Sequence, residues 1–321
     1  MSTDPGYSPL FSPVGTPPLQ ATARIPRRGD EAAPTGYVYD DEGRITLAVN
    51  VALATGRPLL VRGKPGSGKS SLASDVAAKL GWRYYEETIT SRTRARDLLW
   101  SFDAVRRLND SNIRQLKHPL AYITPGVLWW AFSAATAASR GLAAAHLGGR
   151  GLSPLPDPSP RSAERAVVLL DEIDKADPDV PNDLLLPLGA LRFRIADIDD
   201  GPVVTAAEPP LLIITTNEDR DLPQAFIRRC VVLTLPDPTP GRMLAVAKAH
   251  FGNRVPQGRL EQVRAAYLEV RDNRAPGQHE PNLAEFLDAV AAVAFLDVNG
   301  DPQWEQVVEF ALRKPAPDSA S

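Results

Sequence analysis

The segment GKPGSGKS, residues 63–70, decides the fold of this chain. It satisfies the pattern G-x-x-x-x-G-K-[ST] and lies between a short apolar run, RPLLVRG (57–63), and a stretch of helical periodicity, 70–80. Glycines in such a loop let the backbone wrap closely around phosphate groups and point its N–H groups at them, and the start of the helix adds a partial positive charge. The sequence therefore predicts a phosphate-binding loop between a strand and a helix.

The polar groups of this loop have distinct expected roles. Lys69 is expected to reach the β- and γ-phosphates of a nucleotide, and the hydroxyl of Ser70 is expected to ligate Mg²⁺. The residues expected to contact the nucleotide are Gly63, Lys64, Pro65, Gly66, Ser67, Gly68, Lys69, Ser70 and Ser71. A glycine-rich turn that merely starts a helix is the alternative, but the motif and its position together favour nucleotide binding.

A second motif, VVLLDEID (167–174), is an apolar run that ends in acids. A buried strand would deliver Asp171 to the carboxyl edge of a sheet, where it can hold Mg²⁺ and its hydration shell, and Glu172 can orient and polarise an attacking water. The alternative is an acidic turn that caps the next helix. Asp174 is expected to cap a helix or to pair with Lys175 rather than to act in catalysis.

Two further segments carry candidate catalytic residues. LLIITTN (211–217) places Asn217 at the end of another apolar run, where its amide could hydrogen-bond the water and the γ-phosphate, although a turn asparagine is the simpler alternative. AFIRRC (225–230) places Arg228 and Arg229 just before the next core strand. Such arginines either pair with acids on their own surface or reach the γ-phosphate of a neighbouring subunit as an arginine finger.

The order of apolar runs predicts the fold class. Continuous apolar segments at 57–63, 82–89, 166–170, 211–216 and 231–235 are separated by helical patterns, which indicates an α/β fold with a parallel sheet covered on both faces. Residues 191–207 differ, because two alternating stretches flank Asp-Asp-Gly, and this pattern is typical of a hairpin. From about residue 239 the strands stop and helical patterns follow, so we expect a small all-helical domain.

Proline and glycine mark the expected boundaries. The stretches expected to be irregular or disordered are a Pro-rich arm at 1–35, a surface loop at 141–164 and a tail at 315–321. The sheet domain is then expected at 36–238 and the helical domain at 239–314.

Composition excludes several classes of protein. The 321 residues are 43% hydrophobic and 23% charged, which suffices for a packed core. The net charge of −3 argues against a broadly basic nucleic-acid binder. A single cysteine, Cys230, excludes an intramolecular disulfide and a cysteine-based zinc site.

The sequence also indicates the cellular compartment in which we expect the protein. No uninterrupted apolar run reaches the ~18–20 residues that span a bilayer, and the segment MSTDPGYSPLFSPVG lacks the basic start and apolar stretch of a secretion signal. We therefore expect a cytoplasmic protein without a membrane partner.

The four motifs in this order resemble those of the AAA+ ATPases, and within them the MoxR-like group, over roughly residues 36–310. Two features favour this group: the hairpin at 191–207, and a segment at about 90–128 that looks like the helix-2 insert of these ATPases. The resemblance implies an αβα P-loop NTPase domain followed by a helical lid. It also implies ATP and Mg²⁺ as cofactors and a homo-oligomeric ring, usually a hexamer. Such a ring remodels or activates a client protein, often one with a von Willebrand factor A domain.

One position departs from the pattern of this group. Its members often carry an arginine at the start of a lid helix, where this chain has Asn282, so the coupling of hydrolysis to lid movement is in doubt. Asn282 motivates a first alternative function, a nucleotide-gated assembly scaffold with little turnover. A second alternative is a nucleic-acid-linked motor of the restriction or helicase-loader type. It is motivated by the arginines within 92–107 and disfavoured by the acids interleaved with them.

Overall fold

The computed structural model describes residues 9–13, 37–39, 43–142, 165–274, 279–296 and 301–313. The predictions for most of 1–35, for 143–164 and for 315–321 fall outside the described residues. The chain divides into two compact units, which are described separately. Of the described residues, the first unit holds 9–13, 43–62, 73–142 and 165–234. The second holds 37–39, 63–72, 235–274, 279–296 and 301–313.

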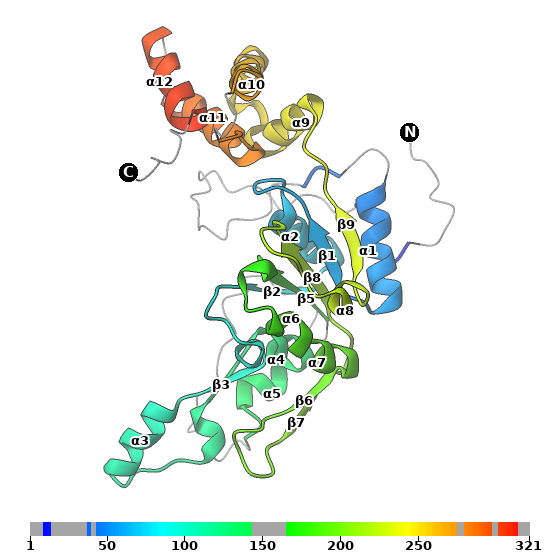
Figure 1. Ribbon diagram of the computed structural model, residues 1–321, viewed down its shortest axis with the longest axis vertical. Helices are drawn as coiled ribbons and strands as arrows, with labels where there is room; N and C mark the ends of the chain where they lie inside the picture. The colour runs from blue at the N-terminus through cyan, green and yellow to red at the C-terminus, as the bar shows by residue number, and fades with distance from the viewer. Residues whose placement is uncertain are drawn as a thin grey trace. The chain divides into compact units, whose positions relative to one another are not determined.

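A five-stranded parallel sheet forms the centre of the first unit, in the order β2-β5-β8-β1-β9 (Figure 1). Its strands are β1 (Leu59–Arg62), β2 (Arg83–Thr88), β5 (Ala166–Asp171), β8 (Leu211–Thr216) and β9 (Val231–Thr234). The side chains of β8 are all buried, as are the first five of β5, because the central strands are covered on both faces. The predicted parallel α/β sheet is thus confirmed.

The register of the sheet brings several strand ends together. Arg62, the last residue of β1, lies opposite Thr216, the last residue of β8, and Leu170 of β5 lies opposite Ile214. The carboxyl ends of β1, β5 and β8 therefore form one edge. The chain passes directly from β1 into Gly63, the first residue of the phosphate-loop motif.

Helices pack against this sheet. Helix α1 (Arg44–Thr55) packs on β1 and β9, and α4 (Val127–Phe132) packs on β2 and β5. Every side chain of α4 is buried, and Trp129 is among the largest fully buried residues of the described chain. Further helices of this unit are α5 (Ala134–Ser139), α6 (Asp179–Asp183), α7 (Leu185–Ala190), α8 (Gln224–Ile227) and the short 3-10 turns Ala95–Leu98, Pro119–Tyr122 and Ile173–Lys175.

Two antiparallel hairpins extend from the sheet region. Strands β3 (Trp100–Phe102) and β4 (Ile123–Pro125) pair with each other and carry α3 (Ala104–Asn112) between them. Strands β6 (Arg192–Arg194) and β7 (Val203–Thr205) form the second hairpin, as predicted for 191–207. The ring of Phe193 stacks on Trp100, with centroids 5.5 Å apart, and thereby joins the second hairpin to the first.

A short N-terminal segment is anchored on α1, within the stretch for which the sequence predicts an irregular arm. Phe11 is 2% exposed. The side chain of Asn50 accepts a hydrogen bond from the Phe11 N–H and donates one to the Phe11 carbonyl, both at 2.8 Å. This paired contact satisfies the backbone of Phe11 in the way a neighbouring strand would.

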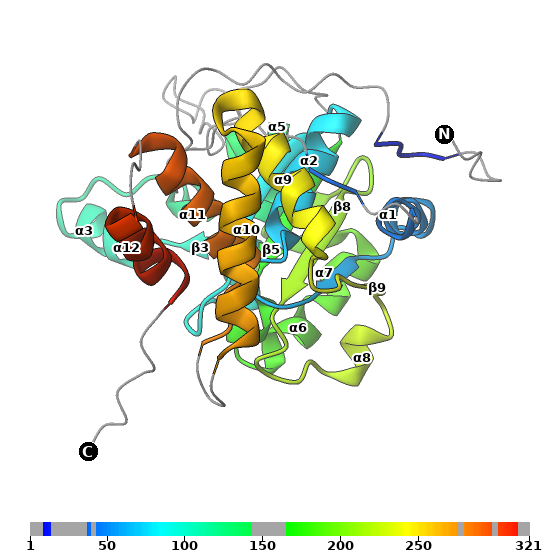
Figure 2. The same cartoon turned by 90° about the horizontal axis from the view of Figure 1, so that it is seen from above.

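The second unit is helical apart from the phosphate loop. Its helices are α9 (Pro240–Phe251), α10 (Gln257–Asp272), α11 (Leu283–Phe295) and α12 (Asp301–Leu312), seen from above in Figure 2. They share one apolar core that includes Met243, Val263, Phe286 and Val290. Helix α2 (Lys69–Leu80) begins in this unit and ends in the first. None of the helices in the described part of the chain has the length and apolar character needed to cross a membrane.

Candidate functional site

The acidic motif lies at the carboxyl edge of the sheet, as its sequence predicts. Asp171 ends β5, and its Oδ1 accepts a hydrogen bond from the hydroxyl of Thr215, 2.5 Å away on β8. The same Thr215 oxygen accepts a bond from the backbone N–H of Glu172 at 2.9 Å. Because Thr215 is fully buried, these two bonds fix the tip of β5 against β8.

Glu172 is held in an uncommon backbone conformation. Its φ is 61°, in the left-handed region that non-glycine residues rarely adopt. Its Oε1 accepts a bond from Nδ2 of Asn217 at 3.2 Å, and its Oε2 forms an ion pair with Lys175. This bond to Glu172 raises the pKa of Lys175 above its usual value. Thus Asp171, Glu172 and Asn217, three predicted site residues, meet at one edge.

Asp174 has a role that differs from the one predicted. The expected pairing with Lys175 is wrong, because Lys175 bonds to Glu172 instead. Asp174 is 3% exposed, and its Oδ2 accepts bonds from the backbone N–H groups of Asn217, at 3.2 Å, and Asp219, at 3.0 Å. Its other oxygen, Oδ1, has no hydrogen-bond partner among the described residues. Asp174 therefore positions the segment that carries Asn217.

Sequence reasoning missed Thr215 and the role of Asp174. The signal for Thr215 was present: a strand apolar enough to be a core strand ends in two threonines, both of which are buried in the structure. Buried hydroxyls need partners, and the neighbouring strand end is the nearest source. No local signal identified the partners of Asp174, because they lie more than 40 positions away in the chain.

We expect Asp174→Ala to destabilise the first unit by about 2–3 kcal/mol, since two partly buried backbone N–H groups lose a charged acceptor. Asp174→Asn keeps one acceptor oxygen in place and is expected to cost much less. Denaturant unfolding of both variants, followed by far-UV circular dichroism, measures the difference. Equal destabilisation by the two substitutions would mean that the packing of Asp174, and not its two bonds, matters.

In the second unit the lysine of the phosphate loop is bonded to the loop itself. The ammonium group of Lys69 donates to the carbonyls of Gly63, at 2.7 Å, and Lys64, at 2.9 Å. The side chain is buried, so the charge rests within the loop that the sequence predicts to hold phosphates. All three glycines of the loop have positive φ values that favour this residue type: 151° at Gly63, 77° at Gly66 and 90° at Gly68.

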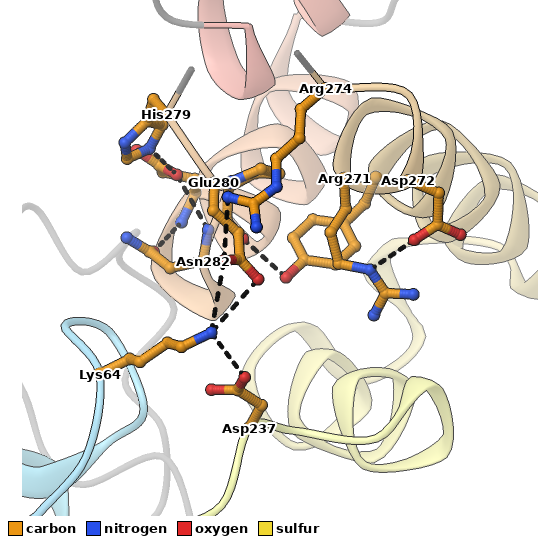
Figure 3. Close-up of polar contacts among 11 residues, drawn as sticks. Lys64, Asp237, Arg271, Asp272, Arg274, His279, Glu280 and Asn282 are labelled. Atoms are coloured by element: carbon orange, nitrogen blue, oxygen red, sulfur yellow. Dashed lines mark hydrogen bonds and ion pairs between the residues drawn. The ribbon is translucent and has the colours of Figure 1, made fainter. Parts of the chain in front are cut away.

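A cavity of about 300 Å³ lies beside this loop within the second unit. Its lining includes Lys64, Ser67, Asp237, Tyr267 and Asn282. Lys64 forms ion pairs with Asp237 at 2.8 Å and with Glu280 at 3.3 Å (Figure 3), and the hydrogen bond with Asp237 is the main reason that its pKa is raised. The loop and the helical part of this unit are thus joined through charge pairs at the cavity wall.

Asn282, the residue in place of the expected lid arginine, caps α11. Its Oδ1 accepts a bond from the N–H of Glu285 at 3.1 Å, and Glu285 returns one to the Asn282 N–H at 2.9 Å. The same Oδ1 would lie 2.6 Å from a Cβ at Gly66, whose φ of 77° also favours glycine. Tyr37 approaches Gly68 from another side, and its hydroxyl bonds to Arg242 at 3.3 Å.

The two candidate finger arginines lie at the amino ends of the sheet strands, whereas Asp171 lies at their carboxyl ends. Arg228 and Arg229 are exposed and precede β9, whose first residue, Val231, pairs with Leu59 at the start of β1. The four residues of β1 separate this amino edge from the carboxyl edge. At about 3.3 Å per residue that is roughly 13 Å. Within one chain, these arginines therefore lie at the other end of the strands from Asp171 and Glu172.

The backbone of this arginine segment is tied down by Arg57. Its guanidinium donates to three consecutive carbonyls, those of Arg228 at 2.5 Å, Arg229 at 3.1 Å and Cys230 at 2.9 Å. The segment's cysteine is buried, as predicted, and burial raises the pKa of the Cys230 thiol to about 11. The backbone is therefore fixed while the two arginine side chains face solvent.

The sheet has the order β2-β5-β8-β1-β9, the phosphate-loop motif follows β1, and Asp171 and Glu172 lie at the end of β5. These features define an AAA+ nucleotide-binding domain, which a helical region follows in the chain. Residues 58–230, more than half of the chain, match the family model described as AAA domain (dynein-related subfamily). The chain belongs to this family. No curated protein matches it.

A proline-to-glycine mutant of RuvB from Thermotoga maritima is 14% identical, with a TM-score of 0.44 over 86% of this chain and 71% of that chain. The Thermotoga maritima RuvB Holliday junction branch migration motor is 15% identical, with a TM-score of 0.40 over 84% of this chain and 67% of that chain. Similarities this low carry no information about function.

Proposed function

We propose that this protein is an ATP hydrolase that works as a ring and remodels or activates a client protein. The observation that carries the proposal is the meeting of Asp171, Glu172 and Asn217 at the sheet edge, with the amide of Asn217 on the carboxylate of Glu172. Family membership supports nucleotide binding. The finer assignment to the MoxR-like group, with a von Willebrand factor A domain in the client, rests on the sequence resemblance alone.

The chemistry is phosphoryl transfer to water. Lys69 binds the β- and γ-phosphates through its ammonium group, which exchanges its bonds to the loop carbonyls for bonds to phosphate oxygens. The Ser70 hydroxyl and the Asp171 carboxylate are hard oxygen donors of the kind that Mg²⁺ prefers, and the ion would offset the charge of the phosphates. Glu172 orients and polarises the water, while Asn217 holds both the Glu172 carboxylate and the water in place.

The finger arginine must come from a neighbouring subunit. Arg228 and Arg229 lie at the amino edge of their own sheet, so they act on a γ-phosphate only if a second copy presents its carboxyl edge to them. This arrangement makes each site shared between two subunits and explains why the function needs a ring.

A mixing experiment tests the shared site. Glu172→Gln and Arg228→Ala subunits are each expected to be inactive alone, but an equal mixture should recover up to about a quarter of the wild-type rate, because one interface in four then pairs an intact Glu172 with an intact arginine. The same mixture with Arg229→Ala identifies which arginine is the finger. ATP hydrolysis is followed by phosphate release. If neither mixture exceeds the sum of its components, the sites are not shared.

A nucleotide-gated scaffold is the second candidate, and the structure of Asn282 favours it. The side chain caps α11 and lies against Gly66, so it cannot deliver a positive charge to a phosphate as a lid arginine would. The scaffold predicts ATP-dependent assembly with little turnover even at saturating protein concentration. Sedimentation with ATP, run beside the hydrolysis assay, separates the two candidates.

A further inference from the structure

The cavity beside the phosphate loop is lined by two parts of the second unit. Lys64, Pro65 and Ser67 line it from the loop, and residues 237–238, 267, 271 and 279–283 line it from the helical part. Ser67 is buried, and its hydroxyl oxygen has no hydrogen-bond partner among the described residues. Buried polar groups ordinarily have partners, so this hydroxyl indicates that the cavity receives a polar ligand.

The acids of the cavity wall are already paired with cations. The ammonium group of Lys64 lies 2.8 Å from Asp237 and 3.3 Å from Glu280. Glu280 also pairs with Arg274, at 3.1 Å (Figure 3). Two carboxylates are thus matched by two cations, and this cluster leaves little net charge to repel an anion from the cavity.

Arg271 is the cation of the described lining that is not committed to such a pair. The other candidate, His279, has its Nε2 2.8 Å from both carboxylate oxygens of the buried Glu285. Arg271 bonds through Nε alone, to the exposed carboxylate of Asp272 at 2.8 Å (Figure 3). Its two terminal nitrogens make no hydrogen bond or ion pair with a described residue. Most donors of this guanidinium are therefore left for a ligand.

The backbone that presents Arg271 is fixed by Tyr267, one turn earlier on α10. Tyr267 is buried, and its hydroxyl donates to the carbonyl of Pro281 at 2.8 Å. Its ring packs edge to face against Phe286, with centroids 5.8 Å apart. These contacts hold the last turns of α10 against the segment that begins α11, so the guanidinium is offered to the cavity from a rigid support.

We propose that Arg271 binds the γ-phosphate of ATP and makes the site discriminate ATP from ADP. A phosphate loop holds the α- and β-phosphates with its own backbone N–H groups, so the γ-phosphate is the one left for a group outside the loop. A guanidinium suits that role, because its planar fork of donors matches two phosphate oxygens. Asn282 carries no charge, and Arg271 supplies the cation from the preceding helix instead. The inference rests on the proposed ATP hydrolysis and adds the residue that recognises the third phosphate.

The test compares the affinities of a non-hydrolysable ATP analogue and of ADP, each with Mg²⁺, by isothermal titration. Arg271→Ala should weaken binding of the analogue by at least about 10-fold and that of ADP by less than about 2-fold, because only the analogue has a γ-phosphate. Arg271→Gln keeps most of the length of the side chain and should show the same selective loss. Arg264→Ala is the matched control, since Arg264 lies on the same helix, pairs with Glu261 and does not line the cavity. It should bind both nucleotides like the wild type.

Three results would overturn the role of Arg271 and leave the ATPase proposal standing. They are unchanged affinity for the analogue, equal losses for the analogue and ADP, and binding of inorganic phosphate to the nucleotide-free protein that Arg271→Ala abolishes without changing the affinity for the analogue. The last result would assign the cavity to a separate anion. Failure of the wild type to bind either nucleotide would instead contradict the proposed function itself. Melting temperatures of both Arg271 variants equal to that of the wild type would show that a selective loss reflects the missing charge.

Discussion

Glu172→Gln is expected to bind ATP with nearly wild-type affinity and to hydrolyse it at least about 100-fold more slowly. The substitution keeps the size of the side chain, and its amide oxygen can still accept the bond from Asn217. It removes the negative charge that, in the proposed mechanism, polarises the attacking water. It also ends the ion pair with Lys175, so the water-positioning group loses both its charge and one of its two anchors.

Binding and turnover must be measured separately to test this expectation. A fluorescent ATP analogue gives the affinity, and steady-state phosphate release gives kcat. Glu86→Gln is the matched control, because it makes the same exchange at an exposed glutamate on β2, the strand beside β5. Turnover at the wild-type rate in Glu172→Gln would show that another group positions the water.

Lys69→Met is expected to weaken ATP binding by about 100-fold or more, because the charged hydrogen bonds proposed between Lys69 and two phosphates are lost. The same change leaves the carbonyls of Gly63 and Lys64 without their donor, so the loop loses its internal support before any nucleotide arrives. We therefore expect a lower melting temperature as well, with a loss of about 1–3 kcal/mol of stability.

Lys248→Met is the control for this variant, since it removes an exposed lysine from α9. Isothermal titration with ATP and Mg²⁺ gives the affinities. If Lys69→Met bound ATP like the wild type, the phosphate loop would not be the nucleotide site, and the proposed ATPase function would be wrong.

The strands were predictable because their signal is local and strong. Continuous apolar runs such as 166–170 and 211–216 are buried on both faces in the observed sheet. Each run therefore predicts a buried strand from its own residues alone. The meeting of Asp171 with Asn217 also follows from the sequence, because the carboxyl ends of neighbouring parallel strands share an edge.

Other features depend on contacts that no local pattern encodes. Val105 on α3 is 71% exposed, whereas the neighbouring Arg106 and Arg107 lie over the rings of Tyr122 and Phe102. Likewise, Asp174 accepts hydrogen bonds from the backbone N–H groups of Asn217 and Asp219, in the segment that follows β8. Such contacts are chosen by tertiary packing and become visible only in the folded chain.

The three hydrogen bonds of the Arg57 guanidinium link two distant parts of the sheet unit. Arg57 lies just before β1, and its three bonds attach the start of that strand to the backbone of Arg228 and Arg229. The other end of β1 continues directly into the phosphate loop. In the ring proposed above, β1 would connect the phosphate loop of one subunit to the arginine side chains that this subunit presents to the next. A displacement of the loop on loss of a phosphate would then be transmitted along β1 to the neighbouring subunit.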